Sequence, residues 1–294
     1  MNNISKGYED INVSVVDYNT SIAEHIWNCN KMTWKKLQNI PYDCNNSDIE
    51  KMVLDVAMGK ALPMAREQAI ITFRLNNISR VCLAQITRQF ESRFNIESQM
   101  PEPVNHNVIL PLNIANDVDL SEKAIKLIKQ SQELYNELIE KGFPPQDCRY
   151  LLMHGQTTSG VYVVNINKFV SSFAMRCENN LSDEINLVYR LCLYEFKRRL
   201  IYDYNNDLID RLTYKFYSIM LENADCMGAK QHVGKNIDKV FGNSFKRYND
   251  ANEEVTSITE NCDYDYTKSA WYQELKRLPE YLLFDGEKEM IKKW

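Results

Sequence analysis

The stretch QITRQFESRFNIES, residues 85–98, is the one short segment of this sequence that gathers polar side chains suited to a phosphate and a base. Upstream of it, every second residue over 69–75 is apolar, which predicts a half-buried strand. The pair Asn76-Asn77 ends that alternation, so we expect the strand to stop there.

A helix is predicted after the strand, with Ser79 as its N-cap. At 100° per residue, Gln85 and Arg88 fall on the same side of this helix. Asn95 to Ser98 come after the helix, and we expect them to lie at one of its ends. That arrangement suits an anion, because guanidinium and hydroxyl donors then converge on one place.

Further along the chain come three short segments and one single residue that belong to the same pattern. They are residues 148–152, which contain Arg149, then Asn165, then residues 173–176, which end at Arg176, and then residues 183–185. Together with residues 85–98, they resemble the flavin-dependent thymidylate synthases. The signature of that family reads R-H-R-x-x-S-x-N-E-x-S-x-R-Y after a glutamine. The resemblance spans about residues 50 to 200 and says nothing of 223–294.

The signature is matched in part. Gln85, Arg88, Asn95 and Ser98 occupy the family's leading glutamine, first arginine, asparagine and second serine. Other residues stand at the positions of the histidine, second arginine, first serine, glutamate, last arginine and tyrosine; they are Gln89, Phe90, Arg93, Ile96, Met100 and Pro101.

The predicted elements form an α+β pattern, and the resemblance implies an antiparallel sheet packed with long helices. We expect a strand within 8–20, helices at 20–37, 48–59, 119–141, from 167, 182–201 and 207–222, and a short helix carrying Arg149. Residues 104–118 are predicted to form a loop, and Asp119 with Glu122 to cap the helix that follows it. Residues 157–160 are predicted to break the short helix that carries Arg149. The domain prediction is 1–222 for the family-like domain and 223–294 for a mostly helical C-terminal extension of unknown role.

The resemblance also implies a set of site residues. Arg176 and Gln85 are the expected catalytic residues, and the nucleotide-binding set is Gln85, Arg88, Ser98, Arg149 and Arg176. Guanidinium suits this role because its planar fork makes bidentate hydrogen bonds to phosphate or to a pyrimidine carbonyl. Glu67, Asn95 and Asn165 are the expected contacts of the cofactor, FAD. Each of these residues also has an ordinary structural reading, as a surface ion-pair partner, a helix residue or a turn residue.

The family's reaction transfers a methylene group from methylenetetrahydrofolate to C5 of dUMP, with hydride from FAD that NADPH replenishes. It needs no enzyme nucleophile, and Cys148 beside Arg149 is a weak candidate for one. Family members are homotetramers with sites shared between subunits, so a homotetramer that binds a pyrimidine deoxynucleotide monophosphate is expected here. Many positions that contact flavin in the family are changed, so weak flavin binding is expected. A C5-hydroxymethylating enzyme and a nucleotide-binding protein without turnover are the alternatives.

Composition limits the remaining possibilities. A net charge of −5 and a pI near 5.6 argue against a general nucleic-acid binder. The eight cysteines form no C-x-x-C pair and are expected to be reduced, and no spacing predicts a metal site. No long apolar run or signal segment is evident in the sequence, so we expect no membrane association and a cytoplasmic protein.

Overall fold

The computed structural model describes residues 4–6, 8, 10–33, 38–89, 91–99, 107–176, 183–233, 246–248 and 254–256. Phe90, Met100, Pro101 and most of the predicted 223–294 extension lie outside the described residues. The strands are β1 (Ile4–Lys6), β2 (Asn12–Tyr18), β3 (Ile70–Ser79), β4 (Arg93–Ile96), β5 (Val108–Leu110), β6 (Thr157–Asn165), β7 (Lys246–Tyr248) and β8 (Glu254–Thr256). The α-helices are α1 (Ile22–Asn30), α2 (Ser47–Ala57), α3 (Arg80–Ile86), α4 (Leu112–Ala115), α5 (Val118–Glu140), α6 (Pro145–Cys148), α7 (Ile166–Arg176), α8 (Asp183–Asn205) and α9 (Arg211–Val233). The 3-10 helices are η1 (Lys31–Thr33), η2 (Pro63–Gln68) and η3 (Arg149–Leu151).

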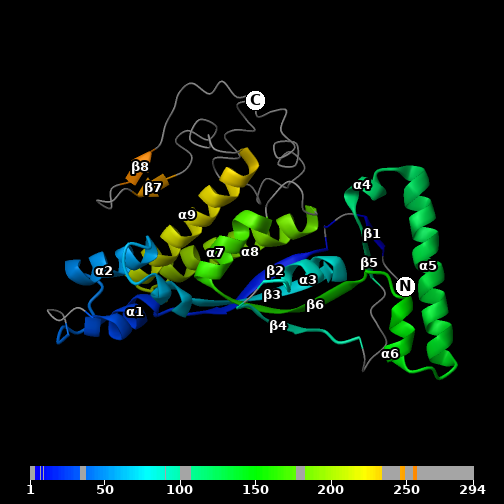
Figure 1. Ribbon diagram of the computed structural model, residues 1–294, viewed down its shortest axis with the longest axis horizontal. Helices are drawn as coiled ribbons and strands as arrows, with labels where there is room; N and C mark the ends of the chain where they lie inside the picture. The colour runs from blue at the N-terminus through cyan, green and yellow to red at the C-terminus, as the bar shows by residue number, and fades with distance from the viewer. Residues whose placement is uncertain are drawn as a thin grey trace.

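The central feature is a four-stranded antiparallel sheet in the order β2-β3-β6-β4. In Figure 1 the helices α7, α8 and α9 lie along one side of this sheet, with α1 and α2 beside α9. The long helix α5 stands apart from the sheet at the other end of the molecule, near α6. The α+β class and the antiparallel sheet packed with long helices are thus confirmed.

Aromatic side chains join the sheet to the helices. Phe73 on β3 is fully buried, and its ring centroid lies 5.5 Å from that of Phe169 on α7. Phe169 in turn stacks on Tyr189 of α8, at 5.8 Å. Burying one such ring contributes about 1.5–3 kcal/mol, so this column of rings fixes α7 and α8 on the sheet.

Strand β3 continues beyond the point where the sequence predicts its end. Asn77 has a φ of +58°, and the pairing of β3 with β6 shifts register between Leu75 and Ile78. Asparagine tolerates this left-handed conformation, and the Asn77 Nδ2 group donates to the carbonyl of Asp10 at 3.0 Å. The Asn76-Asn77 pair is therefore a bulge within the strand, and the prediction that it ends the strand was wrong.

The short helix that carries Arg149 ends at Leu151, before the predicted break at residues 157–160, and these residues begin strand β6. The close approach of β4 explains why residue 160 of this strand is a glycine. A Cβ atom there would lie 2.5 Å from the Asn95 carbonyl oxygen on β4, so only glycine allows β4 to pair this closely. Consequently Asn95 lies on an edge strand, and not at the end of a helix as the sequence analysis expected.

Helix α5 matches the strongest helix prediction, with a different cap. The Asp117 carboxylate accepts from the backbone N–H of Leu120 at 3.0 Å, so Asp117 is the N-cap and the predicted Asp119–Glu122 pair was wrong. Gly142 ends the helix with a φ of +83°. Within the predicted loop 104–118, the structure contains strand β5 and helix α4.

The C-terminal part of the described chain is dominated by α9. This helix runs from Arg211 to Val233, through the predicted domain boundary at 222. Beyond it, the described residues comprise the short antiparallel pair of β7 and β8. Among the described helices, none is both long and apolar enough to cross a membrane.

The junction between β3 and α3 is fixed by one buried carboxylate. Glu184, near the start of α8, accepts hydrogen bonds from the backbone N–H of Ser79 at 2.6 Å and from the Ser79 hydroxyl. The same Ser79 oxygen accepts from the N–H of Cys82 at 3.0 Å, which confirms Ser79 as the predicted N-cap of α3. Burial raises the pKa of Glu184, and the two bonds from Ser79 oppose the rise without cancelling it.

The raised pKa of Glu184 predicts the sign of a pH effect on stability. Because the folded protein holds this proton more tightly than the unfolded chain, the stability contribution is present below the ordinary pKa of 4.5 and is lost as the pH rises through the folded value. We expect the thermal midpoint of the wild type to fall, relative to Glu184→Gln, over this range. Thermal scans of both proteins from pH 4 to pH 8 measure it.

Glu137→Gln is the matched control for that experiment. Glu137 is exposed, and its hydrogen bond from Lys141 lowers its pKa, so its small effect has the opposite sign. Parallel pH profiles for the wild type and Glu184→Gln would contradict the assignment.

Candidate functional site

Arg176 and helix α3 form the first group of predicted site residues. Helix α7 begins at the end of β6 and runs 11 residues, about 16 Å, to Arg176. Arg176 is half-buried, and its Nε atom is buried without a hydrogen-bond partner among the described residues. Burial raises the pKa of Cys82 on α3, and the charge of Arg176 opposes that rise, so the guanidinium lies close to α3.

Gln85 and Arg88 continue from the same helix. Gln85 is half-buried on α3, one turn beyond Cys82, and Arg88 is exposed in the turn after α3 ends at Ile86. The structure thus places Gln85 on the helix that Arg176 approaches at Cys82, and leaves Arg88 on the surface. A guanidinium and an amide are the side-chain groups that a flat polar ligand would pair with.

Gln89 occupies the signature's histidine position, and the structure gives it a structural role. It is buried, it accepts a hydrogen bond from the Tyr162 hydroxyl at 2.9 Å, and its amide donates to Tyr189. Burial raises the pKa of both tyrosines, and Arg176 opposes each rise. Gln89 is therefore the centre of a neutral, buried hydrogen-bond network beside Arg176.

Ser98 and Arg149 form the second group, at the other end of α3. Both side chains are exposed, Ser98 just after β4 and Arg149 at the start of η3. Arg80, the first residue of α3, lies between their two segments. Its Nη2 group donates to the Glu97 carbonyl at 3.1 Å, one residue before Ser98, and Arg149 lowers the pKa of Arg80.

The two groups are separated by the length of α3. Arg80 and Gln85 are five residues apart, so their Cα atoms differ by about 8 Å along the helix axis. That spacing is comparable with the size of a nucleotide monophosphate. Both groups lie at the end of the sheet where β3 runs into α3.

The predicted cofactor residues lie elsewhere on the sheet. Asn165 ends β6, opposite Ile70, and the half-buried Glu67 lies in η2 just before β3, so these two share one end of the sheet. Asn95 on β4 pairs with Val161, four residues from Asn165 and about 13 Å along the strand.

The Asn165 side chain already has a structural task. Its Oδ1 atom accepts from the backbone N–H of Lys168 at 2.7 Å, which caps α7. With that acceptor used and Gln89 enclosed in its tyrosine network, two positions that contact flavin in the family serve the fold. The prediction of weak flavin binding stays a prediction, and these internal contacts of Asn165 and Gln89 are compatible with it.

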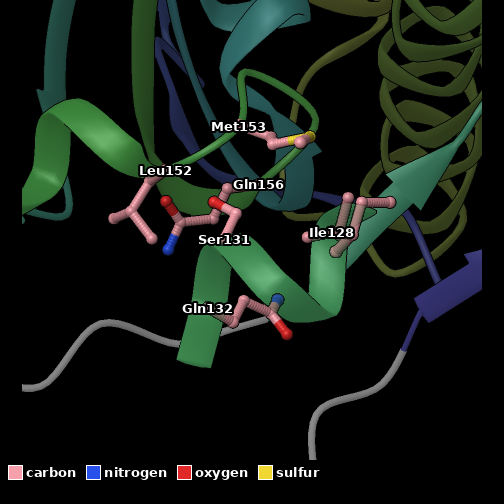
Figure 2. Close-up of a pocket in the computed structure, with 7 residues that line it drawn as sticks. Ile128, Ser131, Gln132, Leu152, Met153 and Gln156 are labelled. Atoms are coloured by element: carbon pink, nitrogen blue, oxygen red, sulfur yellow. The ribbon is translucent and has the colours of Figure 1, made fainter. Parts of the chain in front are cut away.

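A small hollow lies between α5 and the loop that follows η3. Figure 2 shows Ile128, Ser131 and Gln132 of α5 facing Leu152, Met153 and Gln156 across it. Its cavity volume is about 10 Å³, room for about one water molecule, and no charged side chain lines it. This hollow therefore does not suit a nucleotide.

Metal and thiol chemistry have little support within the described residues. No group of three or more His, Cys, Asp or Glu side chains is placed to hold a metal ion there. Cys148 is buried, and its thiol points to the Phe143 carbonyl at 3.7 Å. A thiol used in this way is poorly placed to attack a substrate.

Sequence reasoning missed Arg80 and the structural use of Gln89. Arg80 belongs to no motif, and its only sequence signal is that it follows the N-cap Ser79. Its proximity to Arg149 depends on contacts between segments 70 residues apart in the chain. Gln89 was treated as a lost cofactor contact, because its tyrosine partners lie 73 and 100 residues away.

With the fold and site described, comparison with known proteins identifies the class. Residues 14–200 match the family model described as thymidylate synthase complementing protein (Thy1). This match covers more than half of the chain. The chain therefore belongs to the thymidylate synthase complementing protein family.

Individual relatives are similar to this chain over the same region. The flavin-dependent thymidylate synthase of Pyrococcus abyssi is 26% identical over 195 residues, which cover 64% of this chain and 80% of the relative. The corresponding protein of Sulfolobus acidocaldarius is 31% identical over 140 residues, covering 45% and 51%. The UMP/dUMP methylase PolB from Streptomyces cacaoi, bound with 5-Br dUMP, has a similar fold, with a TM-score of 0.53, 14% identity and coverage of 73% of this chain and 96% of PolB.

Proposed function

We propose that this protein transfers a one-carbon group from methylenetetrahydrofolate to C5 of a pyrimidine deoxynucleotide monophosphate, with dUMP as the default substrate. Family membership and the relatives' names support this reaction class. The observation that carries the proposal is the Arg176 guanidinium near Cys82 of α3, whose buried Nε has no hydrogen-bond partner among the described residues. A desolvated cation with an unused donor is suited to a polar ligand.

In this proposal the chain orients and polarises the nucleotide. Arg176 donates to a carbonyl oxygen of the pyrimidine, and Gln85 pairs with a donor and an acceptor on its edge. The positive charge polarises that carbonyl, and the two contacts together orient C5 toward the methylene carbon. Arg149 and Ser98 bind the phosphate end, and Arg88 adds positive charge at the mouth of the site.

The atoms balance without an enzyme nucleophile. A new bond forms between C5 and the methylene carbon, the bond from that carbon to the folate nitrogen breaks, and the proton on C5 is lost. For dTMP, the methylene group must also gain a hydride, with NADPH as the ultimate donor. A flavin, when bound, supplies that hydride transfer.

Hydroxymethylation is the second candidate. Here water adds to the transferred methylene group, so that dUMP, methylenetetrahydrofolate and water give 5-hydroxymethyl-dUMP and tetrahydrofolate without net reduction. The observation that favours it is the internal use of Asn165 and Gln89 at positions where the family contacts flavin. A protein that binds the nucleotide without turnover is the third possibility.

Product analysis tests the function directly. Purified protein is incubated with dUMP and methylenetetrahydrofolate, with and without added FAD and NADPH, and the nucleotides are separated by chromatography and identified by mass. We expect dTMP only when the reductant is present. Formation of 5-hydroxymethyl-dUMP without reductant would favour the second candidate, and recovery of unchanged dUMP in every mixture would contradict both enzymatic candidates.

The eroded cofactor positions predict weak flavin binding. Each lost hydrogen bond removes about 0.5–1.5 kcal/mol, so losing several costs about 2–7 kcal/mol of binding free energy. We expect purified protein to be colourless, or to lose its flavin during gel filtration. A stoichiometric absorbance band near 450 nm (the ordinary flavin maximum) that survives gel filtration would contradict this expectation.

Arg176→Ala is predicted to weaken binding of dUMP. Removal of charge-assisted hydrogen bonds costs about 1.5–3 kcal/mol, or roughly 10- to 100-fold in affinity. Calorimetric titration with dUMP measures the loss, and circular dichroism checks that the variant is folded. Arg198→Ala on α8, which removes an exposed arginine paired with Glu195, is the matched control and should bind like the wild type. Equal affinities for the wild type and a folded Arg176→Ala protein would argue against the assigned role.

We further infer that the site is shared between subunits of a homotetramer. In support, the exposed Arg149 and Ser98 lie at one end of α3, and the half-buried Arg176 lies toward the other. If Arg149 and Arg176 of one site come from different copies, each single variant disrupts every site, whereas a mixed assembly has some intact sites.

Co-expression provides the test. Arg149→Ala and Arg176→Ala proteins, each inactive alone, are expected to recover part of the wild-type activity when they assemble together. Light scattering gives the mass of the assembly. A monomer near 34.5 kDa, or no recovery in verified mixed assemblies, would contradict a shared site.

A further inference from the structure

Backbone hydrogen bonds hold Arg80 beside Arg149. The N–H of Arg80 donates to the Gln156 carbonyl at 3.0 Å, and the N–H of Val81 donates to the His154 carbonyl at 3.1 Å. The loop 154–156 follows η3, which begins at Arg149. The first turn of α3 is thereby docked on this loop, and two arginines that are 69 residues apart in sequence become neighbours.

The surroundings of Arg80 leave part of its guanidinium unsatisfied. The Nη2 atom of Arg80 donates to the Glu97 carbonyl at 3.1 Å. Its Nε atom is buried and has no hydrogen-bond partner within the described residues. Burial lowers the pKa of Arg80, Glu97 opposes this, and Arg149 adds to the lowering. Two cations thus lie close together, and one of them is partly desolvated, which is costly without an anion.

The nearby Glu97 carboxylate offsets the repulsion from Arg149, but the effect of burial on Arg80 is larger than either charge. The Glu97 side chain is exposed, and its Oε2 atom accepts from the backbone N–H of Ser159 at 3.3 Å. Arg80 instead contacts the backbone carbonyl of Glu97. The segment that Arg80 holds in this way leads directly to Ser98, whose hydroxyl is the kind of donor that phosphate accepts.

We propose that Arg80 is a further binding residue, which together with Arg149 and Ser98 receives the 5′-phosphate of the nucleotide. The inference rests on the proposed nucleotide substrate and adds a residue that no motif marked. A phosphate between the two guanidiniums turns their repulsion into charge-assisted hydrogen bonds, because each planar fork matches its oxygens. The phosphate then lies at the start of α3, about 8 Å along the helix axis from Gln85 of the same chain.

The test compares a nucleotide with its nucleoside. Affinities for dUMP and for deoxyuridine are measured by calorimetry and by ligand-observed NMR, which extends to millimolar binding. For Arg80→Met, which keeps an apolar side chain of similar length, we expect a 10- to 100-fold loss of affinity for dUMP and an unchanged affinity for deoxyuridine. Arg80→Lys keeps the charge without the planar fork and should lose less, again for dUMP alone.

Control variants and a second ligand separate the alternatives. Arg198→Met, at an exposed arginine of α8, should leave both affinities unchanged. Equal losses of dUMP and deoxyuridine binding in Arg80→Met and Arg80→Lys would overturn the proposal by assigning Arg80 a purely structural role. A loss confined to added FAD would overturn it too, because the pair would then bind a dinucleotide diphosphate. Unchanged dUMP affinity in folded Arg80→Met or Arg80→Lys would also overturn the proposal.

The wild type distinguishes failure of this inference from failure of the proposed function. If the wild type binds dUMP and deoxyuridine equally well, the phosphate role of Arg80 is overturned while the nucleotide function stands. If the wild type binds neither ligand, both proposals are overturned.

Discussion

The buried hydrogen bonds between Glu184 and Ser79 determine where the candidate site lies. Ser79 ends β3 and caps α3, and Glu184 begins α8, so this one carboxylate joins the sheet, the short helix and the long helix. Seven residues are too few for α3 to be stable alone, because isolated helices of that length do not form in water. Its orientation, and with it the positions of Arg80 and Gln85, therefore depends on this buried contact. The family resemblance marked 183–185, and the structure supplies the physical reason for a glutamate there.

The sheet separates two kinds of predicted site residue. The residues predicted to bind the nucleotide lie where β3 runs into α3, and the predicted cofactor residues Glu67 and Asn165 lie at the opposite end of β3 and β6. Helix α7 links the ends, because Asn165 caps its start and Arg176 stands at its last turn. Asn165 thus affects the placement of Arg176, because it caps the start of α7 and Arg176 lies at the end of the same helix. Its role in the fold and any contact with a cofactor compete for the same side-chain atoms.

Gln89 shows how a changed motif position can be reused. An amide has both a donor and an acceptor, so it pairs with two tyrosine hydroxyls in the core without bringing a charge. Near the charged Arg176, a neutral network avoids a second buried cation, which a protonated histidine would introduce. The substitution keeps the core intact beside Arg176.

The sequence by itself determined the α+β class, the family, and the helices with clear caps and periodicity, and it predicted the arginines of the candidate site. Those features are local, since a cap or an apolar stripe is written within a few residues. The bulge at Asn77, the close pairing at Gly160 and the network around Gln89 depend on partners tens of residues away. Arg80 is the clearest case, because nothing adjacent to it in sequence distinguishes it from a surface arginine. Only the docking of α3 on the loop 154–156 brings its partly desolvated charge next to Arg149, and such proximity is a property of tertiary structure alone.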